Sequence, residues 1–122
     1  MTNSNTYRTT RLLITVLTLL ISSFSVYSQT TFLQHFTTKK GLPSNNCYYT
    51  IQDSKGYIWV ATDAGVSRFD GKVFENFSID DGLPDNQILQ LKEDKSGKIW
   101  FLALNGQLSY FLNGKIYNEN ND

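Results

Sequence analysis

The sequence predicts an all-β protein in which one four-stranded antiparallel unit occurs twice. Three observations predict this class. Aromatic residues make up 14% of the 122 residues, and together with many Thr, Ile and Val residues they favour strands over helices. Turn motifs recur at constant spacing from residue 41 onward. Two apolar runs, at residues 58–61 and 99–104, lack the alternation of a sheet with one wet face, which indicates that both faces are covered.

The first 28 residues differ from the rest and have the pattern of a secretory signal peptide. Arg8 and Arg11 form a positive n-region, and residues 12–21 form the apolar run LLITVLTLLI. Val26 and Ser28 suit the −3 and −1 positions of a cleavage site, so we expect a signal-peptide helix, cleavage after Ser28 and a periplasmic location. The alternative is an uncleaved N-terminal membrane anchor. The uncharged run is only about 15 residues long, short of the ~20 that a spanning helix needs.

From residue 41 the chain repeats with a period of 41 residues, which is the signature of a repeat architecture. Three anchors keep the same register, and after them the second copy gains two residues. The period divides the chain into a signal peptide (1–28), a leading strand (29–40), a first repeat (41–81) and a second repeat (82–122). The anchors are GLPSN at 41–45 and GLPDN at 82–86, DSKGYIW at 53–59 and DKSGKIW at 94–100, and Gly65 and Gly106.

The anchors mark turns between strands. Pro43 fixes φ and removes a backbone donor, so the GLPxN segment is a loop between units. In the Asp53-x-x-Gly56 segment, the carboxylate is expected to accept bonds from the turn amides and the glycine to adopt the left-handed conformation. Four strands per unit lie between these turns. The predicted strands are Cys47–Gln52, Tyr57–Thr62, Val66–Phe69 and Val73–Ser78 in the first unit, and Ile88–Glu93, Lys98–Leu104, Gln107–Leu112 and Lys115–Tyr117 in the second.

Four antiparallel strands in about 41 residues is the size of one β-propeller blade. The fold prediction is therefore two blades of an incomplete propeller. A small sandwich or barrel with chance similarity is the alternative. Residues 32–38 add a further match, because Phe36 precedes Gly41 by five residues as Phe77 precedes Gly82. This segment is predicted to be the outer strand of a blade whose other strands are missing.

The segments GLPSNN at 41–46 and QDSKGYIWVATDAGVSRFDGK at 52–72 resemble the two-component regulator propeller repeats, which read approximately GLPSN…I…D..G.IW.GT..GL.R.D. The second unit departs from this pattern at Ala103-Leu104 and at Ser109-Tyr110. The resemblance implies a periplasmic sensor region of a hybrid sensor histidine kinase, with an oligosaccharide-type ligand for the parent sensor. It implies no catalysis by this chain, which contains no kinase residues.

The sequence offers no catalytic, metal or cofactor site. Asp53 and Asp94 are interpreted as turn residues, and a metal at Asp80-Asp81 would need more oxygen ligands. Trp59 and Trp100 are expected in the core between blades, with stacking on sugars as the alternative. Four loop amides could contact a ligand but are also ordinary turn residues: Asn45, Asn46, Asn86 and Gln87. The histidine, His35, is expected at the surface. The cysteine, Cys47, is expected to be buried.

Two blades are too few for a closed propeller, which has about four to eight. Asp122 lies 41 residues after Asp81, where a third repeat would begin, so the chain is expected to be a fragment of a longer sensor. The alternative is a stand-alone exported interaction module that is completed by self-association or by a partner chain. Nucleic acid is not an expected partner, since the net charge is zero and no basic stripe occurs.

Overall fold

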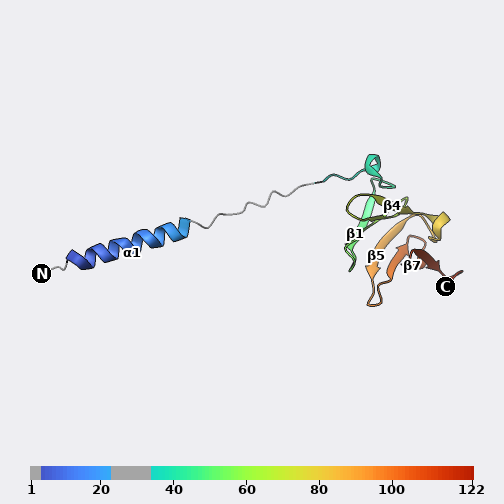
Figure 1. Ribbon diagram of the computed structural model, residues 1–122. Helices are drawn as coiled ribbons and strands as arrows, with labels where there is room; N and C mark the ends of the chain where they lie inside the picture. Colours follow the sequence, from blue (N-terminus) through green and yellow to red (C-terminus); the bar gives the residue numbers. More distant parts are fainter. Residues whose placement is uncertain (1–3, 23–33) are drawn as a thin grey trace. The chain divides into compact units, whose positions relative to one another are not determined.

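The computed structural model describes residues 4–22 and 34–122, which belong to two separate compact units. In the first unit, residues Ser4–Ser22 form helix α1 (Figure 1). The hydroxyl of Thr15 donates to the carbonyl of Arg11 one turn earlier, and Thr18 donates in the same way to Ile14. Among the described helices, none combines the length and apolar character needed to cross a membrane. A helix is confirmed in this segment, and its identity as a signal peptide stays a prediction. The cleavage position after Ser28 lies outside the described residues.

The second unit contains two four-stranded antiparallel sheets, each with its strands in sequence order, as predicted (Figure 1). This arrangement is consistent with two propeller blades. We call β1 to β4 blade 1 and β5 to β8 blade 2. The predicted strand ends agree to within one residue. The strands are β1 (Cys47–Gln52), β2 (Ile58–Thr62), β3 (Gly65–Phe69), β4 (Phe74–Phe77), β5 (Ile88–Glu93), β6 (Ile99–Ala103), β7 (Leu108–Leu112) and β8 (Lys115–Asn118).

The two blades repeat each other in their irregularities as well as in their strands. The register between β1 and β2 shifts between Cys47 and Tyr49, and the register between β5 and β6 shifts between Ile88 and Gln90. The two shifts lie 41 residues apart in the sequence, which is one repeat period. A bulge at the same place in both blades bends the first strand in the same way, so the repeat extends to local backbone geometry.

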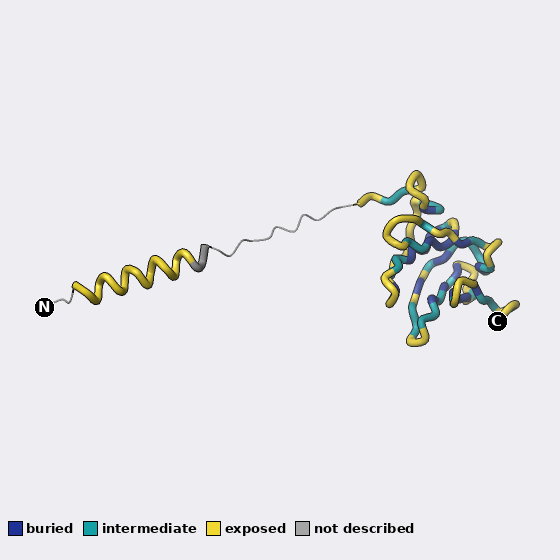
Figure 2. The backbone as a smooth tube through the Cα atoms, in the orientation of Figure 1, coloured by how far each residue is buried: buried dark blue, intermediate teal, exposed yellow. Residues whose placement is uncertain are grey.

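One face of blade 1 packs against one face of blade 2 and forms the hydrophobic core. Trp59 is 1% exposed, and its ring lies 5.9 Å from that of Phe101 and 5.0 Å from that of Phe111. Ala61 and Val66 of blade 1 are fully buried in the same cluster. Every strand except β1 accordingly contains buried residues, while most turn residues are exposed (Figure 2).

The predicted leading strand is wrong over the residues described. Residues 34–37 have no regular structure, and Thr38–Lys40 is a 3₁₀ helix. The position of Phe36 nevertheless follows the repeat. The ring centres of Phe36 and Phe69 are 4.9 Å apart, and those of the equivalent pair Phe77 and Phe111 are 5.4 Å apart. The difference is that Phe77 belongs to β4, which pairs with β3. No strand in the described part of the chain pairs with residues 34–37, and a strand cannot form without backbone partners.

The segment that links two blades is itself a repeated element. Thr38–Lys40 and Ile79–Asp81 are both 3₁₀ helices that end at a glycine in the left-handed conformation. The next leucine is buried in both copies, Leu42 before blade 1 and Leu83 before blade 2. The GLPxN segment therefore fixes each blade to its link, as expected of a loop between units.

Candidate ligand-binding surface

The Asp53 turn positions the tryptophan of blade 1. One carboxylate oxygen, Oδ1, accepts bonds from the backbone N–H groups of Lys55 and Tyr57 at 3.0 and 2.9 Å. The other, Oδ2, accepts the indole N–H of Trp59 at 2.7 Å. Gly56 supplies the left-handed residue that the turn needs, with φ of 90°. The predicted turn role of Asp53 is confirmed.

Asp94 makes the same turn in blade 2. Its Oδ1 accepts the backbone N–H groups of Ser96 and Lys98, and its Oδ2 accepts the indole N–H of Trp100 at 2.8 Å. Bonds from the hydroxyl of Ser96 and from the indole of Trp100 hold the pKa of this carboxyl well below its usual range. Asp94 is therefore an acceptor that orders the turn, as expected of a structural residue.

Between the blades, Arg68 stacks over aromatic rings. Its guanidinium carbon lies 4.7 Å from the ring centre of Tyr57 and 5.0 Å from that of Phe111, close enough for cation–π attraction. It also forms an ion pair with Glu75 on the neighbouring strand. In blade 2 the corresponding position is Tyr110, over which Lys98 lies at 4.1 Å. Each blade thus has a cation on its aromatic face, supplied by different residues.

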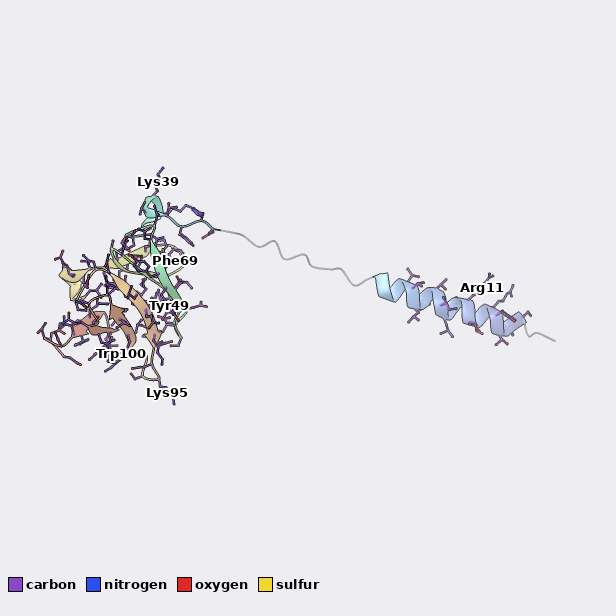
Figure 3. The ribbon with its side chains drawn as sticks, turned by 180° about the vertical axis from the view of Figure 1, so that it is seen from behind. Arg11, Lys39, Tyr49, Phe69, Lys95 and Trp100 are labelled. Carbon is purple, nitrogen blue, oxygen red and sulfur yellow. The ribbon has the colours of Figure 1, made fainter. Side chains whose placement is uncertain are left out.

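A groove of about 680 Å³ follows the inner strands of the two blades and extends across the outer face of blade 2. Tyr49 on β1 is 43% exposed in this groove, and Trp100 on β6 is half-buried (Figure 3). The lining thus combines aromatic rings with amide and charged groups. The lining residues are Tyr49, Ile51, Gln52, Gln90, Leu91, Lys92, Glu93, Trp100, Phe101, Leu102 and Leu108.

The two tryptophans have different environments. Trp59 lies in the core between blades, as predicted. Trp100, predicted to do the same, instead lines the groove, because no described blade packs on its face of blade 2. Sequence reasoning did not foresee the bonds from the two indoles to Asp53 and Asp94. The constant six-residue separation of aspartate and tryptophan is the signal that could have revealed them.

The loop amides are occupied in structural bonds. Asn45 accepts the backbone N–H of Thr38 at 3.0 Å, and Asn86 accepts that of Ile79 at the same distance. Asn46 donates to Asp63 across the loop. These bonds hold the link to its blade, which supports the interpretation of Asn45, Asn46 and Asn86 as turn residues. Gln87 is half-buried, and its backbone carbonyl accepts the backbone N–H of Leu104 at 2.8 Å.

The remaining sequence candidates lie apart from the groove. Asp81 closes the 3₁₀ helix Ile79–Asp81 by accepting the backbone N–H of Ser78, and no group of three or more potential metal ligands occurs among the residues described. His35 is exposed, as expected. Cys47 is exposed, so the predicted buried thiol is wrong. Its counterpart Ile88 is fully buried because blade 1 covers it, whereas no described blade covers Cys47.

Comparison with known families identifies the repeated segments. The model of the two component regulator propeller family matches residues 41–64 and residues 82–105. Each matched segment begins at the glycine of the link, includes the inner strand and the aspartate turn, and ends just after the strand that contains the tryptophan. No curated protein matches the chain.

Proposed function

We propose that this chain, which carries two repeats of the two component regulator propeller family, is the propeller part of an exported sensor that recognises a ligand outside the cytoplasm. In this proposal the chain binds and positions the ligand and catalyses no reaction itself. The repeats connect the chain to two-component regulation, and the groove on the inner strands supplies a surface for recognition.

The observation that carries this proposal is the composition of the groove. Tyr49 presents an accessible ring, and Gln52, Gln90 and Lys92 present hydrogen-bonding groups on the same surface. Binding sites for small molecules are concave and combine apolar walls with a few polar groups. A sugar ring has an apolar C–H face and a rim of hydroxyl groups, so it matches a surface that offers rings beside amides. We therefore propose an oligosaccharide as the ligand class.

Export is part of the same proposal. The basic residues Arg8 and Arg11 lie on α1 ahead of its apolar part, which is the order found in secretory signal peptides. N-terminal sequencing of the chain recovered from the periplasm of a producing bacterium tests this step. We expect the recovered chain to begin at Gln29. Recovery from the cytoplasm with residues 1–28 intact would contradict it.

The ligand class is tested by titrating a panel of neutral oligosaccharides into the purified full chain and measuring the heat of binding. We expect at least one oligosaccharide to bind and Tyr49→Ala to weaken that binding at least about tenfold, because aromatic anchors dominate contact energies. Tyr48→Ala is the matched control, since Tyr48 is 47% exposed on the same strand but does not line the groove. No binding across the panel, or equal losses for the two variants, would contradict the proposal.

A further inference from the structure

The outer face of blade 2 is largely apolar, and no described blade packs on it. Tyr110 on this face is nevertheless buried, with Lys98 4.1 Å from its ring centre and Asp122 accepting from its hydroxyl. Leu108 is 55% exposed, and Trp100 and Leu102 are half-buried. The register of β6, β7 and β8 places Trp100 beside Tyr110 and Tyr110 beside Tyr117, so these residues share the face. We call Trp100, Leu102, Leu108, Tyr110 and Tyr117 the open face of blade 2.

The corresponding face of blade 1 is already covered within the chain. Its residues Trp59, Ala61 and Val66 occupy the repeat positions of Trp100, Leu102 and Leu108, and each is at most 1% exposed because blade 2 packs on them. The open face of blade 2 has larger apolar residues at two of these three positions. We therefore expect the open face of blade 2 to be covered by an apolar, aromatic surface similar to the opposite face of blade 2, which packs on Trp59.

This chain contains such a surface on the outer side of blade 1. On blade 2, the residues that contact Trp59 are Phe101 and Phe111. Their equivalents on blade 1 are Val60 and Phe69, which face away from blade 2 according to the strand register. At the edge of the same face, Cys47 and Thr50 are exposed, whereas their equivalents Ile88 and Leu91 are buried. We call Cys47, Thr50, Val60, Phe69 and Phe74 the open face of blade 1, because no described blade packs on it. On this face Val60 is buried, and Phe69 and Phe74 are half-buried.

The polar contacts between the blades also have equivalents on the open faces. The backbone N–H and the hydroxyl of Ser54 donate to the carboxylate of Glu93 at 2.8 and 2.6 Å and join the two blades at their turns. The equivalent positions are Lys95 on blade 2 and Gln52 on blade 1. The backbone N–H of Lys95 can donate as that of Ser54 does, and the side-chain carbonyl of Gln52 can accept in place of the carboxylate of Glu93.

We propose that the open face of blade 2 binds the open face of blade 1 in a second copy of this chain, head to tail. The contact continues the packing already present between the two blades. Because each copy would offer one face and accept the other, the contact is heterologous and closes into a ring when the rotation allows. With two blades per copy, a ring of four to eight blades needs two to four copies.

Two local features accommodate this contact. Phe36 lies against Phe69 and Phe74, where the outer strand of an incoming blade would lie, so residues 34–37 have to move aside. These residues form no regular structure that would resist the movement. Tyr49 is 43% exposed although blade 2 packs on the face of blade 1 to which Tyr49 belongs. The end of the groove at the inner strands should therefore also stay accessible when a blade of a second copy docks. The contact involves only residues of the two copies and no ligand. Head-to-tail binding is thus an inference separate from the proposed sensing role.

Sedimentation of the purified full chain without ligand tests the contact. We expect a discrete oligomer of two to four copies, and we expect Leu108→Asp to raise the apparent dissociation constant at least about tenfold by burying a charge in the contact. Val73→Asp is the matched control, because Val73 is apolar and 64% exposed but lies in the turn between β3 and β4, outside both open faces. Its oligomer should be unchanged. A monomer at about 100 μM, or equal dissociation by the two variants, overturns the proposal.

Cross-linking distinguishes head-to-tail binding from a symmetric contact. Ile88 and Ala61 belong to one buried cluster, and their equivalents are Cys47 and Leu102. In Leu102→Cys, mild oxidation should therefore join Cys47 of one copy to the introduced cysteine at position 102 of another, which peptide mass spectrometry identifies. Disulfides that join position 102 to itself would show that two blade 2 faces meet and would overturn head-to-tail binding. The absence of any disulfide involving position 102 would also count against it.

Discussion

Trp59 and Trp100 occupy the same position in two copies of one repeat, yet their environments differ. Both donate an indole N–H to the aspartate six residues earlier, at 2.7 and 2.8 Å. Trp59 is buried against blade 2, whereas Trp100 lines an open groove. The local hydrogen bonds are thus properties of one blade, while burial is a property of a pair of blades. The comparison shows which interactions a blade supplies itself and which its neighbour must supply.

The hydroxyls of Ser67 and Ser109 show the same division in the sheet interior. Both serines are buried at equivalent positions. The hydroxyl of Ser67 bonds to the side chain of Asn76 at 2.6 Å, whereas the hydroxyl of Ser109 has no partner. Asn76 and Asn118 both donate to the glycine of the preceding link, but the side-chain oxygen of Asn118 accepts from the backbone N–H of Asn120 and not from Ser109. In the described part of the chain, the hydroxyl of Ser109 is therefore a buried polar group without a hydrogen-bond partner.

The tryptophan pair gives the largest expected effect. Trp59→Ala should lower the free energy of unfolding by about 3–5 kcal/mol, since it leaves a cavity between the blades. Trp100→Ala should lower it by less than about 2 kcal/mol, because less apolar surface is buried around Trp100. Urea unfolding followed by circular dichroism measures both. Equal losses would mean that the bond to aspartate, common to the two residues, matters more than the packing between blades.

A glycine pair gives the next effect. Gly65 and Gly106 both have positive φ, so alanine at either position should cost about 1–2 kcal/mol of strain. A Cβ at Gly65 would also lie 2.2 Å from the backbone oxygen of Phe77, whereas a Cβ at Gly106 would meet nothing within 4 Å. Gly65→Ala should therefore cost about 1–3 kcal/mol more than Gly106→Ala. Thermal unfolding of the two variants checks the difference, and a similar melting temperature would contradict it.

The smallest expected effect is a pH dependence at the turn of blade 2. The pKa of Asp94 is lowered in the folded state, so its contribution to stability is present above the ordinary value of about 3.9 and is lost as pH falls through the folded pKa. The stability difference between the wild type and Asp94→Asn should be constant from pH 7 to pH 5 and shrink at lower pH. Ser96→Ala removes the bond that contributes most to the shift, so it should move the loss to higher pH. Urea midpoints at each pH measure this, and an unchanged profile in Ser96→Ala would assign the shift to another group.

Much of the fold followed from the sequence because its signals are local. A proline in the link, an aspartate and a glycine in the turn after the first strand of each blade, further glycines in the later turns and the 41-residue period located all eight strands. Their bonds join residues of one blade, as in the contact of Asp53 with Lys55 and Tyr57. The candidate groove was not predicted, since it joins Tyr49 of one blade to Gln90 and Trp100 of the other. Residues that meet across blades have no fixed spacing that the sequence reveals.

The sequence by itself determined the repeat, the turns and the four-stranded form of each blade. Tertiary structure alone decided that Trp59 is buried while Trp100 is accessible, that Cys47 is exposed and that residues 34–37 are not a strand. The physical reason is that turns and hairpins satisfy their hydrogen bonds within about 40 residues of chain. Burial and strand pairing at the ends of a stack depend on the neighbouring blade, which the residues of one repeat cannot specify.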